Sequence, residues 1–426
     1  MEDLNKNNKT EEKKEKFVLF AISYGDEEAA NKSLDELALL IDTAGATEKD
    51  RLIQNRDIPE YTTYFGKGKI DELKMLLWDN ECDGIVCDDE LSPVQAKNLE
   101  EALDTKVLDR TQIILDIFAK HASTSEGKLQ VELAMLKYRL SRLTGAGKSM
   151  SRLGGGIGTR GPGEKKLETD RRLINKRVAR LRKELMSLQA HRDVTRVKRI
   201  RNNIPTIAIV GYTNAGKSTL INKLTNSDIL AKDKLFATLD PTTRNLKLHS
   251  GQEVIITDTV GFINKLPHNL IDAFRSTLEE AKYADIIFHV VDASSKDREL
   301  QMQVVYNTLE VLGIMNKTVI TLFNKCDKFD DYSELRDTKA SKSLIISAKE
   351  DIGIENVKMV LEDILRKEKI FLERLIPYKE ASNLSIIRSK GEIIQEDYRN
   401  DGIYIKAYVP KEIYGRCAGL IDKESL

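Results

Sequence analysis

The stretch TIAIVGYTNAGKSTLINKL, Thr206–Leu224, decides how the central part of the chain folds. Its opening residues form an apolar run typical of a buried strand, and its last seven residues have the spacing of a helix. Between them, GYTNAGKS (Gly211–Ser218) matches the phosphate-loop pattern G-x-x-x-x-G-K-[ST]. Backbone N–H groups of such a loop surround phosphates, and the N-terminus of the following helix adds a favourable potential. We therefore expect a nucleotide site here, with Lys217 reaching the β- and γ-phosphates and Ser218 binding Mg²⁺.

A second copy of the letters AGKS lies upstream, in SRLTGAGKSMSR (Ser141–Arg152). Arg142 stands where the first glycine of a phosphate loop is required, and a helical leucine pattern precedes it instead of a strand. The upstream copy is therefore predicted to belong to a flexible basic loop. In that loop Lys148 would meet RNA phosphate rather than a nucleotide.

Three more short motifs follow the downstream copy, each at the end of an apolar run. DTVG (Asp258–Gly261) predicts a carboxylate that reaches Mg²⁺ through water and a Gly261 N–H that meets the γ-phosphate. NKCD (Asn324–Asp327) places Asp327 where it can accept hydrogen bonds from guanine N1–H and N2–H₂, a donor pair that adenine lacks. In SAK (Ser347–Lys349) a backbone N–H can contact guanine O6. Together, in this order, the four motifs predict a GTPase.

Alternating strands and helices predict two α/β domains, one over residues 17–110 and a GTPase domain with a mainly parallel six-stranded sheet over residues 204–367. Between them, apolar seams with 4-3-4-3 spacing run from Leu129 to Leu143 and from Ile174 to Leu188. They predict a helical hairpin over residues 111–203, with a glycine-rich loop over residues 144–163. Two alternating runs around Asn400-Asp401-Gly402 predict a strand hairpin in a small α+β domain over residues 368–426. Residues 1–16 are polar and are predicted to be a disordered tail.

The predicted helical hairpin is strongly basic. Residues 137–201 hold twenty Lys or Arg and five Asp or Glu, although the whole chain has a net charge of zero. A loop without bulky side chains can enter a narrow RNA cavity, where its arginines contact phosphates and stacked bases. The alternative is an ordinary solvated charged helix. We favour RNA contact, and the predicted RNA-binding residues are Lys148, Arg152, Arg160, Lys165, Lys166, Arg171 and Arg172.

Several segments resemble the HflX family of ribosome-associated GTPases, within the translation-factor-related branch of P-loop GTPases. They are GYTNAGKSTL, FATLDPTTR, TDTVGFI, GGGIGTRGPGEKKLETDRR and TTYFGKGK, and they span residues 62–349. The resemblance implies that the glycine-rich loop reaches the peptidyl-transferase region and that the large ribosomal subunit stimulates hydrolysis. It also implies splitting or rescue of stalled ribosomes under stress, with rRNA, GTP and GDP as partners and Mg²⁺ as cofactor.

The resemblance places the first switch loop at LFATLDPTTR (Leu235–Arg244), where one threonine closes on Mg²⁺ and the γ-phosphate. Thr238 is the first choice by resemblance to related GTPases, and Thr242 is the alternative. The predicted metal ligands are therefore Ser218 and Thr238. The predicted nucleotide-binding residues are Gly211, Tyr212, Thr213, Asn214, Ala215, Gly216, Lys217, Ser218, Phe236, Ala237, Thr238, Leu239, Asp240, Asp258, Thr259, Val260, Gly261, Asn324, Lys325, Cys326, Asp327, Ser347, Ala348 and Lys349.

Phe262 follows DTVG at the position where many GTPases carry a glutamine that orients the attacking water. A phenyl ring cannot hydrogen-bond to water, so hydrolysis by the chain alone is expected to be slow. Phe262 either only packs on the switch or marks a site that awaits a partner. The motifs single out no residue as a catalytic base.

The polar start, four scattered cysteines and the lack of an apolar run of ~18 residues predict a cytoplasmic protein that does not enter a membrane. A monomer is the expectation. Two other functions stay open: a GTPase of ribosome assembly or RNA modification, and a non-enzymatic RNA-binding protein whose nucleotide only stabilises the fold. YFGKGK (Tyr64–Lys69) is a further candidate nucleotide site, although it lacks the phosphate-loop pattern.

Overall fold

The computed structural model describes residues 14–150, 162–201, 204–225, 235–236, 242–265, 267, 280–314, 317–328, 332–333, 335–367 and 369–418. Most of the predicted tail and residues 151–161 of the predicted loop lie outside these ranges. The chain divides into two compact units, and each is described by itself. The first comprises residues 1–187, 234–237 and 265–274, and the second comprises the remainder. No helix in the described ranges is both long and apolar enough to cross a membrane.

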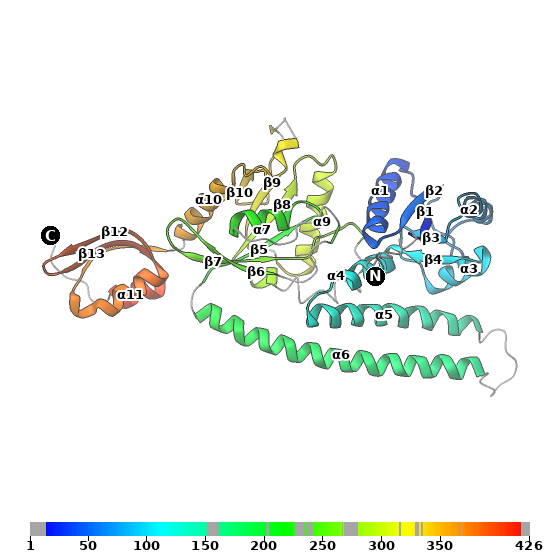
Figure 1. Ribbon diagram of the computed structural model, residues 1–426, viewed down its shortest axis with the longest axis horizontal. Helices are drawn as coiled ribbons and strands as arrows, with labels where there is room; N and C mark the ends of the chain where they lie inside the picture. Colours follow the sequence, from blue (N-terminus) through cyan, green and yellow to red (C-terminus); the bar gives the residue numbers. More distant parts are fainter. Residues whose placement is uncertain are drawn as a thin grey trace, which may run out of the picture. The chain divides into compact units, whose positions relative to one another are not determined.

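The first unit contains a parallel sheet in the order β2-β1-β3-β4 (Figure 1). Helices α2 and α3 pack on the sheet face that carries Val18, Phe20 and Ile22. Phe17 and Leu19 on the other face are also buried, and α1 covers the sheet there and contacts α4. The elements are β1 (Lys16–Ser23), α1 (Glu27–Ala44), β2 (Thr47–Asn55), α2 (Lys67–Asp79), β3 (Gly84–Cys87), α3 (Pro93–Leu103), β4 (Lys106–Asp109) and α4 (Arg110–His121). Tyr64 and Phe65 of YFGKGK are core residues of this domain, and α2 begins two residues later.

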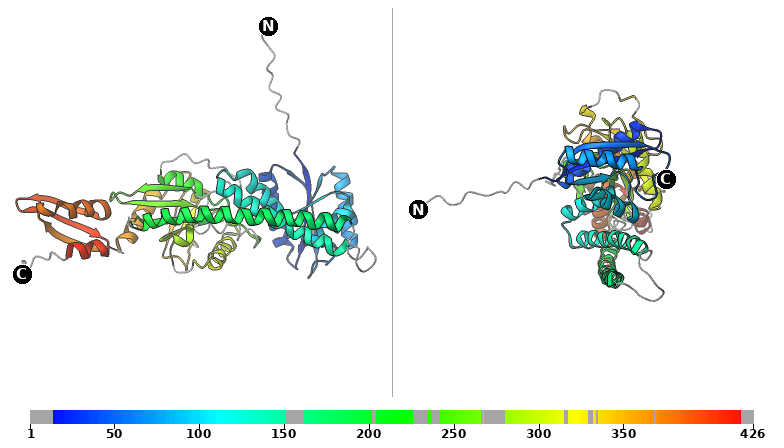
Figure 2. Two further views of the ribbon diagram at one scale, coloured as in Figure 1. Left: turned by 90° about the horizontal axis from the view of Figure 1, so that it is seen from below. Right: turned by 90° about the vertical axis from the view of Figure 1, so that its right-hand side faces the viewer.

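Two long helices, α5 (Ser125–Met150) and α6 (Pro162–Arg201), form the predicted hairpin and run side by side in all views (Figures 1 and 2). Their seam buries Leu133, Val178 and Leu181, with Leu129, Leu136, Ile174 and Leu185 partly buried around them. The Arg177 guanidinium donates two hydrogen bonds of 2.7 Å to Glu132 across the seam. The apolar spacing read from the sequence is therefore the contact between the helices.

The helices of the hairpin extend further than the glycines predict. Residues 144–150 were expected in the loop but form the last turns of α5, and residues 162–163 begin α6. A glycine inside a helix costs only about 1 kcal/mol, and adding residues to an existing helix is far easier than starting one. The long apolar seam supplies that existing helix.

The second unit contains a six-stranded sheet in the order β10-β9-β8-β5-β7-β6, parallel except for β6, as the sequence predicts. Helices α7 and α10 pack on one face, whereas α9 packs on the other. The elements are β5 (Thr206–Gly211), α7 (Lys217–Thr225), β6 (Thr243–Lys247), β7 (Glu253–Asp258), β8 (Ile286–Asp292), α9 (Arg298–Val311), β9 (Thr318–Asn324), η1 (Cys326–Lys328), β10 (Lys342–Ile345) and α10 (Ile354–Lys367). The predicted motifs follow the carboxyl ends of β5, β7, β9 and β10, where ligands of such sheets bind.

A three-stranded antiparallel sheet, in the order β11-β13-β12, closes the second unit. Asn400 and Asp401 connect β12 to β13, which confirms the predicted strand hairpin. Its core contains Leu372, Ile405 and Val409 beneath Leu384 and Ile387. The elements are β11 (Ile370–Ile376), η2 (Tyr378–Glu380), α11 (Ala381–Lys390), β12 (Glu392–Arg399), β13 (Gly402–Val409) and α12 (Lys411–Ala418).

Candidate nucleotide-binding site

The loop between β5 and α7 is a tight turn that depends on its glycines. Gly216 has a left-handed backbone conformation with φ of 94°, and a side chain there would collide with the Asn324 amide. Gly211 lies so close to Val290 that a Cβ would overlap the Val290 carbonyl. Asn214 has φ of 61°, a conformation that asparagine adopts more readily than most residues. The local backbone therefore fits the phosphate loop predicted from the sequence.

Lys217 begins α7, and its side chain is buried beneath this loop. Its Nζ donates hydrogen bonds to the carbonyl oxygens of Gly211 (3.1 Å) and Tyr212 (2.8 Å). Burial lowers the pKa of Lys217 to about 8, and the Asp258 carboxylate opposes that shift. An anion placed beside this buried cation would therefore be strongly favoured, and it would raise the pKa of the lysine.

Two oxygen ligands meet beside the loop. Ser218 Oγ donates a hydrogen bond of 3.1 Å to Asp258 Oδ2 at the end of β7, where Asp258 is fully buried. Mg²⁺ prefers oxygen ligands and is usually bound by one or two protein oxygens together with substrate phosphates. The hydroxyl and carboxylate fit that requirement. Within the described ranges, no group of three or more His, Cys, Asp and Glu side chains could hold a metal by itself.

Gly261 closes the phosphate end of the site. A Cβ at this position would lie 2.9 Å from Lys217 Nζ and 2.9 Å from Thr213 Cγ2, so no larger residue fits without displacing one of them. This close approach also puts the Gly261 backbone beside the lysine ammonium. The structure thus brings the phosphate loop and the DTVG motif together.

Phe262 links the same two motifs through its backbone and not through its ring. Its N–H donates to Gly211 O (3.1 Å), and its carbonyl accepts from the Thr213 N–H (2.8 Å). The ring is buried in the core beside Ala208 and Val210. The ring therefore packs in the core and is in no position to orient a water molecule, and whether the site awaits a partner stays a prediction.

The NKCD motif joins three segments of the site. Asn324 is buried; its Nδ2 donates to Ala215 O (2.9 Å), and its Oδ1 accepts from the Ala348 N–H (2.9 Å). Lys325 forms an ion pair of 2.7 Å with Asp292. Asn324 therefore fixes the phosphate loop and the SAK motif relative to each other.

Asp327 lies exposed at the end of this motif, and Ser347 Oγ donates a hydrogen bond of 2.5 Å to its Oδ1. Hydrogen bonding from Ser347 lowers the pKa of Asp327, so the carboxylate is ionised at neutral pH. An ionised, exposed carboxylate held by one hydroxyl can accept the two donors of a guanine edge.

The first switch segment is described only in part. Phe236 is buried, and its ring meets that of Phe118 at 4.7 Å, so this side chain packs in the first unit. Thr242 directly precedes β6, and its carbonyl accepts a hydrogen bond of 3.0 Å from the Asp258 N–H. Ala237, Thr238, Leu239 and Asp240 lie outside the described residues, so the choice between Thr238 and Thr242 stays a prediction.

The upstream AGKS lies on helix α5, and Arg142 has a structural role. Arg142 forms an ion pair of 3.0 Å with Asp109, which is fully buried at the end of β4. Asp109 Oδ2 also accepts a hydrogen bond of 2.8 Å from the Tyr138 hydroxyl. This carboxylate ties the first sheet to α5, a role for Arg142 that the sequence pattern does not reveal.

The predicted RNA-binding residues fall into two groups. Arg171 and Arg172 are exposed on α6, and Arg172 pairs with Glu168 at 3.1 Å. The backbones of Lys148, Lys165 and Lys166 are helical, but their side chains lie outside what the structure describes, as do Arg152 and Arg160 entirely. RNA binding by all seven stays a prediction.

Comparison with known proteins gives consistent matches along the chain. Residues 31–119 match the family described as GTP-binding GTPase N-terminal, residues 121–199 match GTP-binding GTPase Middle Region, and residues 206–325 match 50S ribosome-binding GTPase. A protein of Lacrimispora saccharolytica named GTPase HflX is 58% identical over 96% of both chains. Proteins of the same name from Caldanaerobacter subterraneus and Escherichia coli are 48% and 38% identical, over 96% and 87% of this chain and 94% and 88% of their own. These matches confirm the resemblance carried by the sequence motifs.

Proposed function

The chain belongs to the HflX family of GTPases and hydrolyses GTP; from this premise we propose that it is a GTP-controlled factor of the large ribosomal subunit. GTP orders the switch loops, the basic hairpin binds rRNA, and hydrolysis releases the protein. The observation that carries the proposal is the match of residues 206–325 to a 50S ribosome-binding GTPase. In this proposal the factor splits or rescues stalled ribosomes in the cytoplasm.

The residues around the phosphates would act mainly by binding and orienting them. Lys217 stabilises the charge that develops on the β- and γ-phosphates, and the loop N–H groups hold the same oxygens. Ser218 and Thr238 would bind Mg²⁺, with Asp258 reaching it through water; when bound, the ion neutralises phosphate charge. The Gly261 N–H, held beside Lys217, would register the γ-phosphate and so distinguish GTP from GDP.

Base selection would come from Asp327 and the SAK motif. Asp327 accepts from guanine N1–H and N2–H₂, and an adenine base would leave this carboxylate without donors. The Ala348 N–H is used to hold Asn324, so the Lys349 N–H is the better candidate for guanine O6.

Hydrolysis by the chain alone should be slow. The buried ring of Phe262 leaves the usual water-positioning group missing. A ribosomal particle that reshapes the switch loops would then supply the stimulation. Coupling hydrolysis to docking in this way prevents GTP from being consumed by the unbound factor.

The hairpin would carry the contact with RNA. Near the loop, Arg171 and Arg172 are exposed on α6, whereas Arg177 further along the helix is held by two hydrogen bonds to Glu132. Phosphate contacts by Lys and Arg dominate RNA affinity and make it dependent on salt. The end of α6 nearest the loop is therefore the proposed RNA-binding part.

The proposal is tested by co-sedimentation with isolated large subunits in the presence of a non-hydrolysable GTP analogue. The variant Lys165→Gln, Arg171→Gln, Arg172→Gln should lose most subunit binding while it keeps GTP affinity. A matched variant, Lys176→Gln, Arg182→Gln, Lys183→Gln, changes the same charge farther along α6 and should lose less. Normal sedimentation of the first variant would rule out the hairpin as the contact. Accumulation of precursor particles on depletion, with no excess of stalled ribosomes, would instead indicate a role in assembly.

A further inference from the structure

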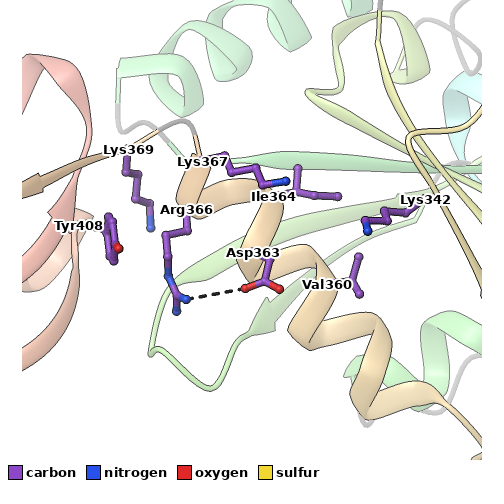
Figure 3. A pocket seen from close by; sticks show the side chains of 8 residues that line it. All are labelled: Lys342, Val360, Asp363, Ile364, Arg366, Lys367, Lys369 and Tyr408. Atoms are coloured by element: carbon purple, nitrogen blue, oxygen red, sulfur yellow. Dashed lines mark ion pairs between the residues drawn. The ribbon is translucent and has the colours of Figure 1, made fainter.

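A pocket of about 430 Å³ lies in the second unit, away from every motif of the nucleotide site (Figure 3). It is formed by α10, the first residue of β10 and the three-stranded C-terminal sheet. Val360 and Ile364 on α10 contribute apolar surface, and Tyr408 of β13 lies across from them. The volume is that of a small-molecule site and not of a site for a single atomic ion.

The charged side chains of the pocket are unequal in sign. Among the residues that the structure describes, Lys342, Arg366, Lys367 and Lys369 line it together with one carboxylate, Asp363. Asp363 is engaged with Arg366 at 3.7 Å, the ion pair drawn in Figure 3. The pocket therefore keeps a positive potential in a chain whose net charge is zero.

Two of the cations are fixed in place by one buried acid. Arg366 donates to Glu392, which also lies 3.8 Å from Lys369. The Arg366 guanidinium stacks over the Tyr408 ring at 5.3 Å, and Lys369 Nζ donates to Gln252 at 2.5 Å. Glu392 and Asp363 together balance the charges of Arg366 and Lys369, so the excess positive charge of the described lining comes from Lys342 and Lys367. Burial lowers the pKa of Lys369, an effect that a bound anion would relieve.

The side chains of the other two cations do not help to stabilise the described part of the fold. Lys342 and Lys367 are exposed at the rim, and neither side chain forms a hydrogen bond or ion pair with any residue that the structure describes. Ammonium groups on flexible stems can converge on one anion without strain. The pocket thus combines fixed inner cations with adaptable outer ones.

We infer that this pocket binds a phosphate group. A phosphate offers several strong acceptor oxygens around one centre, which suits several cations arranged around a cavity better than a carboxylate does. The group belongs either to the backbone of single-stranded RNA or to a free polyphosphate, and the chemistry of recognition is the same. The site shares no residue with the predicted nucleotide site, so it stands or falls independently of the proposed function.

The test uses the full chain saturated with GDP, which blocks the nucleotide site. Affinity for tripolyphosphate is measured by calorimetry, and affinity for a short single-stranded RNA is measured by fluorescence anisotropy. The variant Lys342→Gln, Lys367→Gln removes the two rim charges. The control variant Lys379→Gln, Lys411→Gln removes two exposed charges of the same unit that do not line the pocket. Asp363→Asn removes the one carboxylate found among the described residues of the lining.

The rim variant should weaken binding about tenfold, and the control should change it by less than about twofold. Asp363→Asn should tighten binding about threefold, a gain that a folding defect cannot produce. A response with tripolyphosphate alone identifies a free polyphosphate site, whereas a response with RNA identifies the RNA backbone. Equal affinities of the wild type and the rim variant for both probes, or equal losses in the rim and control variants, would overturn the inference.

Discussion

Guanine recognition by Asp327 gives a prediction whose size follows from the structure. Asp327→Asn keeps the shape of the side chain and an oxygen that can still accept the Ser347 hydroxyl. The substitution removes the negative charge. It also places the asparagine NH₂, a hydrogen-bond donor, opposite the N1–H and N2–H₂ donors of guanine. Each charge-assisted hydrogen bond contributes about 1.5–3 kcal/mol, and Asp327 is exposed, so screening places both bonds at the lower limit.

Losing both bonds should therefore cost about 3 kcal/mol, or roughly a hundredfold in GDP affinity. Xanthine carries a carbonyl where guanine carries its amino group, so the asparagine amide can donate to it. XDP affinity should rise in the same variant, which a general loss of stability cannot cause. Equilibrium titration with fluorescent GDP and XDP measures both changes.

Asp351→Asn is the matched control. Asp351 is an exposed acid two residues beyond SAK, and its φ of 62° is one that asparagine tolerates. This control should keep the wild-type preference for GDP. An unchanged preference in Asp327→Asn as well would refute the reasoning about the base.

Further predictions concern the γ-phosphate contact, the hairpin anchor and pH. Gly261→Ala should slow GTP hydrolysis at least about tenfold, with GDP affinity changed less, because its methyl group would displace Lys217; equal effects on both nucleotides would contradict this. Asp109→Asn should lower the free energy of unfolding in urea by about 2 kcal/mol, because Arg142 loses the carboxylate that holds it. A decrease in the free energy of unfolding of less than about 0.5 kcal/mol would show that Asp109 does not anchor the hairpin. Burial lowers the pKa of His289, so the unfolded chain binds a proton that the folded chain does not. Stability should therefore fall by about 1 kcal/mol per pH unit below about 6.5, and His289→Gln should abolish that dependence in urea unfolding at several pH values.

Sequence patterns predicted the central strands of the two parallel sheets because these strands are buried on both faces. Apolar runs such as those of β1, β5 and β8 have no alternative to the core of a parallel sheet, and the hairpin seam has a spacing that only packed helices use. Strand β2 (TEKDRLIQN) is different, because it lies at a sheet edge and buries only Leu52 fully. Its polar sequence shows no alternation of apolar and polar residues. The position of the short edge strand β6 could not be predicted for the same reason.

The nucleotide site was predictable from the sequence where backbone groups, and not side chains, form its contacts. Close contacts with neighbouring atoms leave no room for a side chain at Gly211, Gly216 or Gly261. The sequence motifs place these glycines at fixed spacing, so their positions could be predicted. The roles of Asn324 and Arg142 were not visible, because each joins segments that lie far apart in the chain. Only the fold shows that Asn324 connects the two ends of the nucleotide site and that Arg142 anchors the hairpin.

The most direct test of the account is GTP turnover by the purified chain alone, with isolated large subunits, and with isolated small subunits. Turnover by the chain alone should be slow, and only large subunits should stimulate it, by roughly tenfold or more. The triple variant at Lys165, Arg171 and Arg172 should keep the basal rate and lose the stimulation. A rate that large subunits leave unchanged, or that small subunits raise equally, would contradict the claim that hydrolysis is coupled to binding of the large subunit.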